Sequence, residues 1–429
     1  MTHDCPGDRP ASRTGLSGAV NLPALRGHNA ALVLDLLRAA GETGASRPEL
    51  AEGTGLTPQA VSKITARLRD AGLVAEAGRR PSTGGKPRTV WRLVRDARHA
   101  VGLHLERDEL TAVLLDLLGG PVAVHRVPFD LGAPPERALD AAVDAVRALP
   151  LPRPLSRPLP HAPVAPVASG APGVGGAAAG VLGVGVACPG PLDHHTGVLG
   201  RVTGFPQWNG RPLRDALAGR LGLPVALDKD TNAAALGLAL RAGSGGTSGT
   251  GGPGDASGSA GDSFAYLHLG TGLGAGLVLG GRLYRGARTG AGEFGHQVVQ
   301  LDGGPRCGCG GRGCLEALCL AAVARGDAAG AARVLGTGAA GLAGLLDVDR
   351  VVLGGRTVLA DPEPYRAGVA AVLAERAART DGRAVPVSVA PDGDRLVADG
   401  AAHLVLAPVF GRLEQGSRPW RGPRGAASG

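Results

Sequence analysis

A glycine-rich stretch, GEFGHQVVQLDGGPRCGCGGRGCLE (residues 292–316), holds the side chains best suited to bind a metal ion. Its histidine and three cysteines follow the spacing H-x10-C-x-C-x4-C and are His296, Cys307, Cys309 and Cys314. Zinc prefers four nitrogen and sulfur ligands in a tetrahedron, and glycines let a short loop turn around the ion. Because the protein would fill all four positions, the pattern predicts a structural zinc site. Free buried thiols or a disulfide are the alternatives.

Three carboxylates accompany this stretch. Glu293 and Glu316 flank the metal-binding side chains, and Asp230 lies in DKDTN, where a strand is expected to meet a helix. Carboxylates are suited to accept hydrogen bonds from the hydroxyl groups of a sugar. For each glutamate taken alone, an ordinary surface or capping role is the alternative.

A glycine-rich turn in LGTGLGAG (269–276) is a second candidate site. Gly270, Thr271 and Gly272 stand where successive backbone amides are able to face a phosphate group. A plain hairpin between two strands is the alternative, and by itself the motif favours the hairpin.

The N-terminal region has the pattern of a DNA-binding module. Three amphipathic helices are expected at 28–41, 46–56 and 57–72, with a capping box from Ser46 to Glu49 and a Thr57–Pro58 start to the third helix. Two short strands, 73–78 and 89–94, flank a basic turn. This order is that of a winged helix-turn-helix, and a helical bundle with a basic surface is the alternative.

Side chains that could read DNA follow from this arrangement. Residues 1–99 hold 15 Lys and Arg against 9 Asp and Glu, which gives this region most of the net charge of +8. Clustered positive charge is typical of polyanion binding. The exposed face of the third helix is expected to present Gln59, Ser62, Lys63, Thr65, Ala66 and Arg67, and the wing to present Arg79, Arg80, Lys86 and Arg88.

The remaining chain alternates strands and helices with glycine-rich turns, which indicates an α/β domain. No run of about 18 uncharged apolar residues occurs, and the N-terminus lacks the apolar core of a signal peptide, so we expect a cytoplasmic protein with no membrane partner. The predicted organisation is a disordered tail (1–22), a winged helix-turn-helix (23–97), an α/β domain (98–412) with low-complexity insertions (150–180 and 244–262), and a second disordered tail (413–429).

These motifs together resemble the ROK family (repressors, open reading frames and kinases). The segment 267–299 followed by CGCGGRGCLE is similar to the family signature, and ACPGPLD, GFPQWNG, DKDTNAAALG and RVVLGG match further landmarks in order. The resemblance implies a two-lobed, actin-like sugar-kinase fold with a sugar between the lobes. It implies that Glu293, His296 and Glu316 hydrogen-bond the sugar, that His296 also ligates zinc, and that Asp230 is the general base in members that are kinases.

Two departures from the family pattern bear on function. Where kinases of the family carry an Asp-x-Gly-Gly-Thr phosphate loop, this chain reads HLERD (104–108), so two glycines are absent and Glu106 and Asp108 would repel a polyphosphate. This argues against ATP and Mg²⁺ as cofactors. Lys229 stands where sugar-binding members usually carry Asn, which leaves the ligand open.

The sequence therefore predicts a sugar-responsive transcriptional regulator, most simply a repressor. As a homodimer or higher homo-oligomer it would bind a palindromic operator. A sugar kinase that uses Asp230 is the first alternative, and a DNA-binding protein that has lost sugar sensing is the second.

Overall fold

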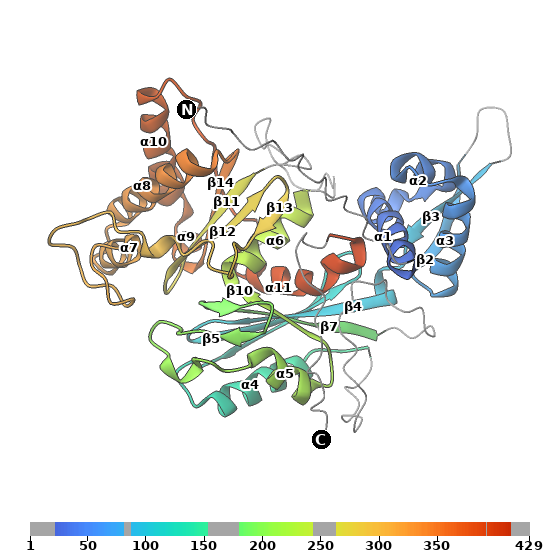
Figure 1. Cartoon of the computed structure of the whole chain (residues 1–429), viewed down its shortest axis with the longest axis horizontal. Coiled ribbons are helices and arrows are strands. Elements are labelled where there is room, and N and C mark those ends of the chain that lie inside the picture. The colour runs from blue at the N-terminus through green and yellow to red at the C-terminus, as the bar shows by residue number, and fades with distance from the viewer. Residues whose placement is uncertain (1–21, 81–86, 153–179, 243–262, 392, 413–429) are drawn as a thin grey trace, which may run out of the picture.

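The computed structural model describes residues 22–80, 87–152, 180–242, 263–391 and 393–412. Both predicted tails, except Leu22, and nearly all of both predicted insertions lie outside these ranges, as does Lys86 of the wing. Three bodies are visible in Figure 1: a small N-terminal unit, which we call the head, and two larger lobes.

The head consists of three helices and a three-stranded antiparallel sheet. The helices are α1 (Leu22–Ala40), α2 (Arg47–Thr54) and α3 (Pro58–Asp70). The strands β1 (Ala45–Ser46), β2 (Val74–Arg80) and β3 (Arg88–Leu93) pair in the order β1-β3-β2. Two of the expected caps are present: Ser46 N–H donates to Glu49 Oε2 at 2.7 Å, and Thr57 Oγ1 accepts from Ala60 N–H at 3.2 Å. These caps satisfy amides that have no partner inside their helices.

Lobe 1 is built on a five-stranded sheet in the order β10-β7-β4-β5-β6. Its strands are β4 (Arg98–Leu105), β5 (Glu109–Asp116), β6 (Pro121–Pro128), β7 (Gly180–Cys188) and β10 (Val225–Lys229). Helices α4 (Pro135–Arg147) and α5 (Leu213–Leu221) cover one face, and a short ribbon of β8 (Leu192–Asp193) and β9 (Val198–Leu199) lies beside them. The core between sheet and helices is formed by apolar side chains such as Leu103, Val143 and Leu217.

Lobe 2 repeats this topology. Its sheet has the order β13-β12-β11-β14-β15, so in both lobes the strands, counted along the chain, run 3-2-1-4-5 across the sheet. The strands are β11 (Phe264–Leu269), β12 (Leu273–Leu279), β13 (Arg282–Tyr284), β14 (Arg350–Gly354) and β15 (Val387–Val389). Helices α7 (Leu315–Ala324), α8 (Ala328–Leu346), α9 (Arg356–Ala360) and α10 (Pro362–Arg379) complete the lobe.

Helix α8 is long and apolar enough to cross a membrane if only its length and composition are considered. In the structure it packs against α7 and α10, and Ala331, Leu335 and Ala339 are fully buried there. These contacts make α8 a core helix of lobe 2.

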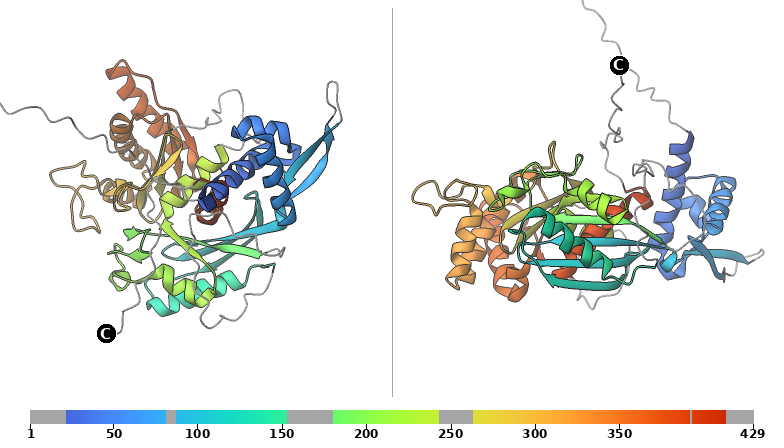
Figure 2. Two further views of the ribbon diagram at one scale, coloured as in Figure 1. Left: turned by 45° about the vertical axis from the view of Figure 1, so that its right-hand side comes forward. Right: turned by 90° about the horizontal axis from the view of Figure 1, so that it is seen from below.

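Two helices lie between the lobes, at the centre of the molecule (Figures 1 and 2). Helix α6 (Asp230–Ala242) packs on β12 of lobe 2, and α11 (Leu396–Leu406) packs on β4 and β7 of lobe 1. Gly102 and Gly185 allow this second contact, because a Cβ atom at either position would collide with the backbone of α11. The first residue of α6 is Asp230, so the strand-to-helix junction predicted from DKDTN is present.

Candidate functional site

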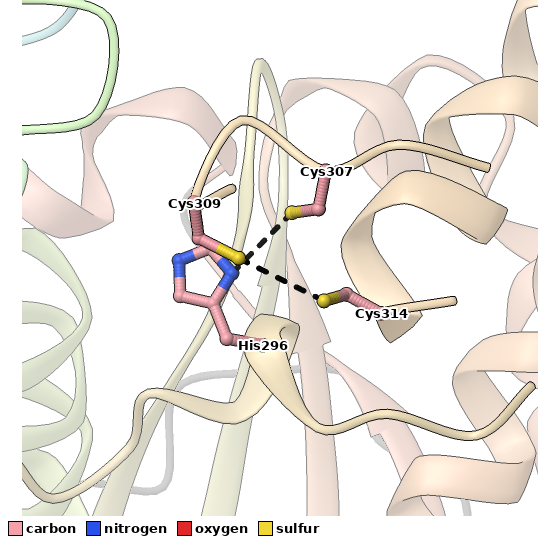
Figure 3. Close-up of side chains that lie close together, drawn as sticks. All are labelled: His296, Cys307, Cys309 and Cys314. Atoms are coloured by element: carbon pink, nitrogen blue, oxygen red, sulfur yellow. Dashed lines mark hydrogen bonds between the residues drawn. The ribbon is translucent and has the colours of Figure 1, made fainter. Parts of the chain in front are cut away.

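The four predicted metal ligands meet beside the start of α7. His296 ends a short 3-10 turn, Cys307 and Cys309 lie on the glycine-rich loop, and Cys314 caps α7 (Figure 3). All four ligand atoms lie within 4.8 Å of one another, with 3.6 Å from Cys307 Sγ to His296 Nδ1 and 3.8 Å from Cys309 Sγ to Cys314 Sγ. A tetrahedral zinc site has ligand-to-ligand distances of about 3.5–3.8 Å. The cluster therefore fits a metal ion of this kind.

Glu316 links this cluster to the glycine-rich turn between β11 and β12. Its Oε2 accepts the backbone N–H of Leu273 at 2.9 Å, and its Oε1 lies 3.8 Å from Cys307 Sγ. Gly270 N–H is bonded to the carbonyl of Gly272 at 3.0 Å, so the turn closes on itself. Thr271 lies between them. The predicted phosphate-facing amide of Gly270 is thus engaged within the turn, as expected for a hairpin.

Lys229 forms an ion pair that joins the two lobes. It ends β10 of lobe 1, and its Nζ donates to Glu293 Oε1 at 3.0 Å and to the carbonyl of Ala291 at 2.6 Å, both on lobe 2. The lysine side chain is almost fully buried, whereas that of Glu293 is 42% exposed. One oxygen of Glu293 is therefore occupied by Lys229, and the other is available to a ligand.

A second ion pair joins the same two segments. Asp228 of β10 is fully buried and pairs with Arg285 of lobe 2, and it also accepts from the amide of Asn232 at 2.8 Å. Sequence reasoning did not identify this pair, because Asp228 and Arg285 are 57 residues apart and belong to different lobes.

Asp230 has an unusual electrostatic environment. Burial raises the pKa of its carboxyl to about 6, against the opposing effects of the Thr231 N–H, which it accepts at 2.6 Å, and of Lys229. Glu293 and Asp228 raise the pKa further, which places these carboxylates within electrostatic range of one another. Asp230 is therefore partly protonated near neutral pH.

This shift predicts a pH-dependent effect of Asp230→Asn. Because the folded-state pKa is raised above about 3.9, folding favours the protonated carboxyl, and that stabilisation is complete below about pH 4 and is lost as pH rises through 6. Asparagine resembles the protonated form, so at pH 4 the variant should have the same free energy of unfolding as wild type. At pH 8 its free energy of unfolding should be larger by up to about 3 kcal/mol, so the variant is the more stable protein there. Urea unfolding between these pH values checks this, and a difference that does not vary with pH would contradict it.

The segment 104–108 of lobe 1, which was predicted to stand in place of a phosphate loop, is tied to lobe 2. Arg356, the first residue of α9, donates to both carboxylate oxygens of Asp108 at 2.9 and 3.0 Å and lies 3.4 Å from Glu106 Oε1. The hydrogen bonds from Arg356 lower the pKa of Asp108, whereas burial raises the pKa of Glu106. We call Arg356, Asp108 and Glu106 the cleft clasp. It holds two carboxylates of lobe 1 against an arginine of lobe 2.

His104 at the start of this segment is buried. Its pKa falls to about 3, chiefly through burial and then through His268 and Arg356, so the imidazole is neutral. A neutral imidazole does not replace the carboxylate that a Mg²⁺ ion needs.

In the head, helix α3 presents the predicted polar face. Gln59, Lys63 and Arg67 are exposed and Ser62 is half-buried, and a shallow hollow is lined by Pro58, Gln59, Ser62 and Lys63. The apolar residues Val61, Ile64 and Leu68 face the core of the head. Arg79 and Arg88 are exposed on the two strands of the hairpin.

One expectation for the head is corrected. Thr65 is fully buried, because its hydroxyl donates to the carbonyl of Val61 at 2.9 Å and accepts from Arg47. It is therefore not on the exposed face. Arg80 donates to Glu49 and to the carbonyls of Thr43 and Gly44, and its side chain is still 43% exposed, so its predicted DNA contact stays a prediction.

The sequence and fold of this chain are similar to those of known proteins. Residues 173–326 match the profile of the ROK family. The chain carries a ROK family domain. This domain includes β7, Asp230, Glu293 and all four residues of the metal cluster.

Relatives with this domain include regulators and kinases. The xylose repressor of Caldicellulosiruptor bescii is 27% identical over 271 residues, 63% of this chain and 59% of the relative. The chain thus spans about 60% of the length of these repressors. The glucokinase of Thermotoga maritima is 41% identical over 144 residues, 33% of this chain and 40% of the relative.

Solved structures share the fold. A ROK family transcriptional regulator, a homologue of the E. coli MLC protein, has a TM-score of 0.64 at 21% identity and covers 91% of this chain and 98% of its own. The ROK hexokinase of Thermus thermophilus has a TM-score of 0.51 at 29% identity and covers 71% and 97%. The ROK domain therefore has the two-lobed kinase-type fold.

Proposed function

We propose that this chain is a sugar-responsive transcriptional repressor. The observation that carries the proposal is the cleft clasp, in which Arg356 binds Asp108 and Glu106 in place of a phosphate loop, while the carboxylates of the sugar side are retained. Similarity to the xylose repressors supports the same function. A chain with a ligand cleft but without phosphate-binding groups is suited to sensing.

We further propose that the head is a winged helix-turn-helix that binds operator DNA. Helix α3 would lie in the major groove with Gln59, Ser62, Lys63 and Arg67 toward the bases and phosphates. Arg79, Arg88 and Lys86 would contact the backbone at the wing. Arg80 would join them, because its side chain is 43% exposed even while it pairs with Glu49. A homodimer of such heads would bind a palindromic site, in the cytoplasm.

The effector is proposed to lie against Asp230, Glu293, His296 and Glu316. A structural zinc ion held by His296 and the three cysteines would fix His296 and, through α7, Glu316. When bound, zinc supplies only this positional restraint, because the protein provides all four ligands. Lys229 would accompany Glu293 in the site and add a donor beside its free oxygen.

A footprint of the DNA upstream of the protein's own gene tests the function. Wild type is expected to protect a palindromic segment, and one of D-xylose, D-glucose, D-fructose or N-acetylglucosamine is expected to weaken binding tenfold or more, which requires about 1.4 kcal/mol of differential affinity. Glu293→Gln should bind DNA normally and lose the response. Protection that no sugar alters would favour a DNA-binding protein without sugar sensing.

A sugar kinase is the second candidate, favoured by the pKa of about 6 at Asp230, which suits a general base. Similarity to glucokinases over 144 residues adds to it. A coupled ATP assay with D-glucose and D-xylose separates the two functions. We expect wild type to show no turnover above the Asp230→Asn variant, because the clasp carboxylates repel a polyphosphate. Turnover above that control would establish the kinase instead.

A further inference from the structure

The head is fixed to lobe 1 by a continuous apolar core. The cluster joins head residues, strands of lobe 1 and helix α11, and includes Val33, Leu37, Trp91, Ala100, Leu115, Ala402 and Leu406. Parts of a protein that share one close-packed core transmit strain to each other and move together. A change within lobe 1 alone would therefore carry the head along with it.

The head also contacts α6, the helix between the lobes that packs on β12 of lobe 2. Arg38 of α1 donates from Nη1 to the backbone carbonyl of Leu240 at 3.2 Å. Leu240 is in the last turn of α6, whose carbonyls have no partner within the helix. The Arg38 side chain is only 9% exposed, because Asp35 binds its Nε and Nη2 and its guanidinium lies over Phe410. These contacts hold the guanidinium of Arg38 in the orientation that lets it donate to the carbonyl of Leu240.

Helix α6 connects this contact to the proposed sugar site. Asp230 is its first residue and Leu240 lies ten residues further on, a rise of about 15 Å. Near its start, α6 lies so close to β12 that a Cβ at Gly276 would collide with the carbonyl of Thr231. The start of the helix is therefore held against lobe 2.

Helix α6 crosses α11 with no side chain between their backbones. A Cβ on Gly400 would collide with the carbonyl of Ala233, and Gly237 packs against Gly400. Beyond the crossing, Arg241 binds the buried carboxylate of Asp399 at 2.9 Å. When lobe 2 turns relative to lobe 1, the last turn of α6 must therefore shift against both α11 and the head.

We propose that Arg38 is the residue through which the position of lobe 2 reaches the head. With the cleft clasp and the Lys229–Glu293 pair formed, as here, the Arg38–Leu240 hydrogen bond is made and restrains α1. When the lobes separate, the carbonyl of Leu240 withdraws and α1 is released at that point. Arg38 is a positioning residue in this scheme. As a route for an effector signal, the scheme rests on the proposed function.

Amide hydrogen exchange of the full chain tests this without sugar or DNA. The variant Arg356→Ala/Glu293→Ala removes two ion pairs between the lobes. We expect residues 31–40 of α1 to exchange about threefold to tenfold faster in it than in wild type, the range set by the net free energy of one hydrogen bond. In the Arg38→Gln background, exchange in α1 should already be raised and should no longer respond to the loosened lobes.

Arg412→Gln is the matched control, because Arg412 binds the same Asp35 and does not share the Arg38 bond to Leu240. When Arg412→Gln is combined with Arg356→Ala/Glu293→Ala, residues 31–40 of α1 should still exchange faster than in Arg412→Gln alone. Arg38→Lys keeps the charge and most of the stem, and should give a reduced response if Arg38→Gln unfolds the head. Unchanged exchange of α1 in the loosened variant, or a full response without Arg38, overturns the proposal. A failed sugar or DNA titration would count against the proposed function and leave this result standing.

Discussion

Replacing Lys63 and Arg67 together with alanine is expected to lower operator affinity by about two orders of magnitude or more. Each contact to a base or phosphate contributes roughly 1–3 kcal/mol, and both side chains are exposed on α3. The logarithm of wild-type affinity should fall steeply with the logarithm of salt concentration, and the slope should lessen in the variant because fewer counterions are released. Mobility shift with the footprinted fragment at several salt concentrations measures both quantities.

Arg92→Ala/Arg95→Ala is the matched control. It removes the same charge from the head. Arg92 lies on β3 and Arg95 on the turn after it, and both pair with Glu42, while Arg95 also pairs with Asp116 of lobe 1. Affinity should change by much less than in the α3 variant. Equal losses in the two variants would mean that overall charge, and not α3, governs binding. An affinity that does not depend on salt would refute the DNA interface altogether.

Local signals in the sequence were sufficient for α2, α3 and the two strands of the hairpin, but not for β1 or for the start of α1 at Leu22. Capping residues and apolar spacing placed α2 and α3, because helix ends are set by backbone amides that neighbouring side chains satisfy. The same reasoning placed Thr65 on the wrong face. Its position next to Ile64 is compatible with either face, and only the contacts with Arg47 and Val61 bury it.

The candidate site was predictable where its residues are close in the chain. His296 and the three cysteines fall within 19 residues, so their spacing alone indicated a common ion. The cleft clasp was not predictable, because Arg356 and Asp108 are 248 residues apart and meet only when both lobes are built. The sequence showed that HLERD lacks the glycines of a phosphate loop. That Arg356 is the partner of its acidic residues could be seen only in the folded structure.

These pairs of residues, distant in the sequence, connect the two lobes to each other. Lys229–Glu293, Asp228–Arg285 and the clasp each join the lobes in the arrangement described here. A ligand bound to the free oxygen of Glu293 would lie beside Lys229 and so would contact both lobes. Its binding energy can therefore change the balance between lobe arrangements, which a ligand bound to one lobe alone could not do.

Removal of the metal is expected to have the largest effect on the ROK domain. Cys309→Ser/Cys314→Ser should reduce bound zinc from about one ion per chain to nearly none, measured by atomic emission. Structural zinc contributes roughly 10–16 kcal/mol of apparent binding energy in small peptides. In the loop 300–313 the side chain of Leu301 is 87% exposed, so it adds little apolar packing. We expect this loop to become sensitive to limited proteolysis and the midpoint of thermal unfolding to fall. Loss of the fixed His296 should also abolish the response to sugar.

Cys319→Ala serves as the control, since Cys319 is a fully buried thiol of α7 outside the metal cluster. It should retain zinc and the protease resistance of the loop, with only the loss of packing expected for a small buried side chain. Treatment of wild type with a chelator should reproduce the Cys309→Ser/Cys314→Ser phenotype, and added zinc should reverse it. A purified chain that holds no zinc, and whose thermal midpoint neither chelator nor zinc changes, would show that the four side chains are a thiol cluster without a metal.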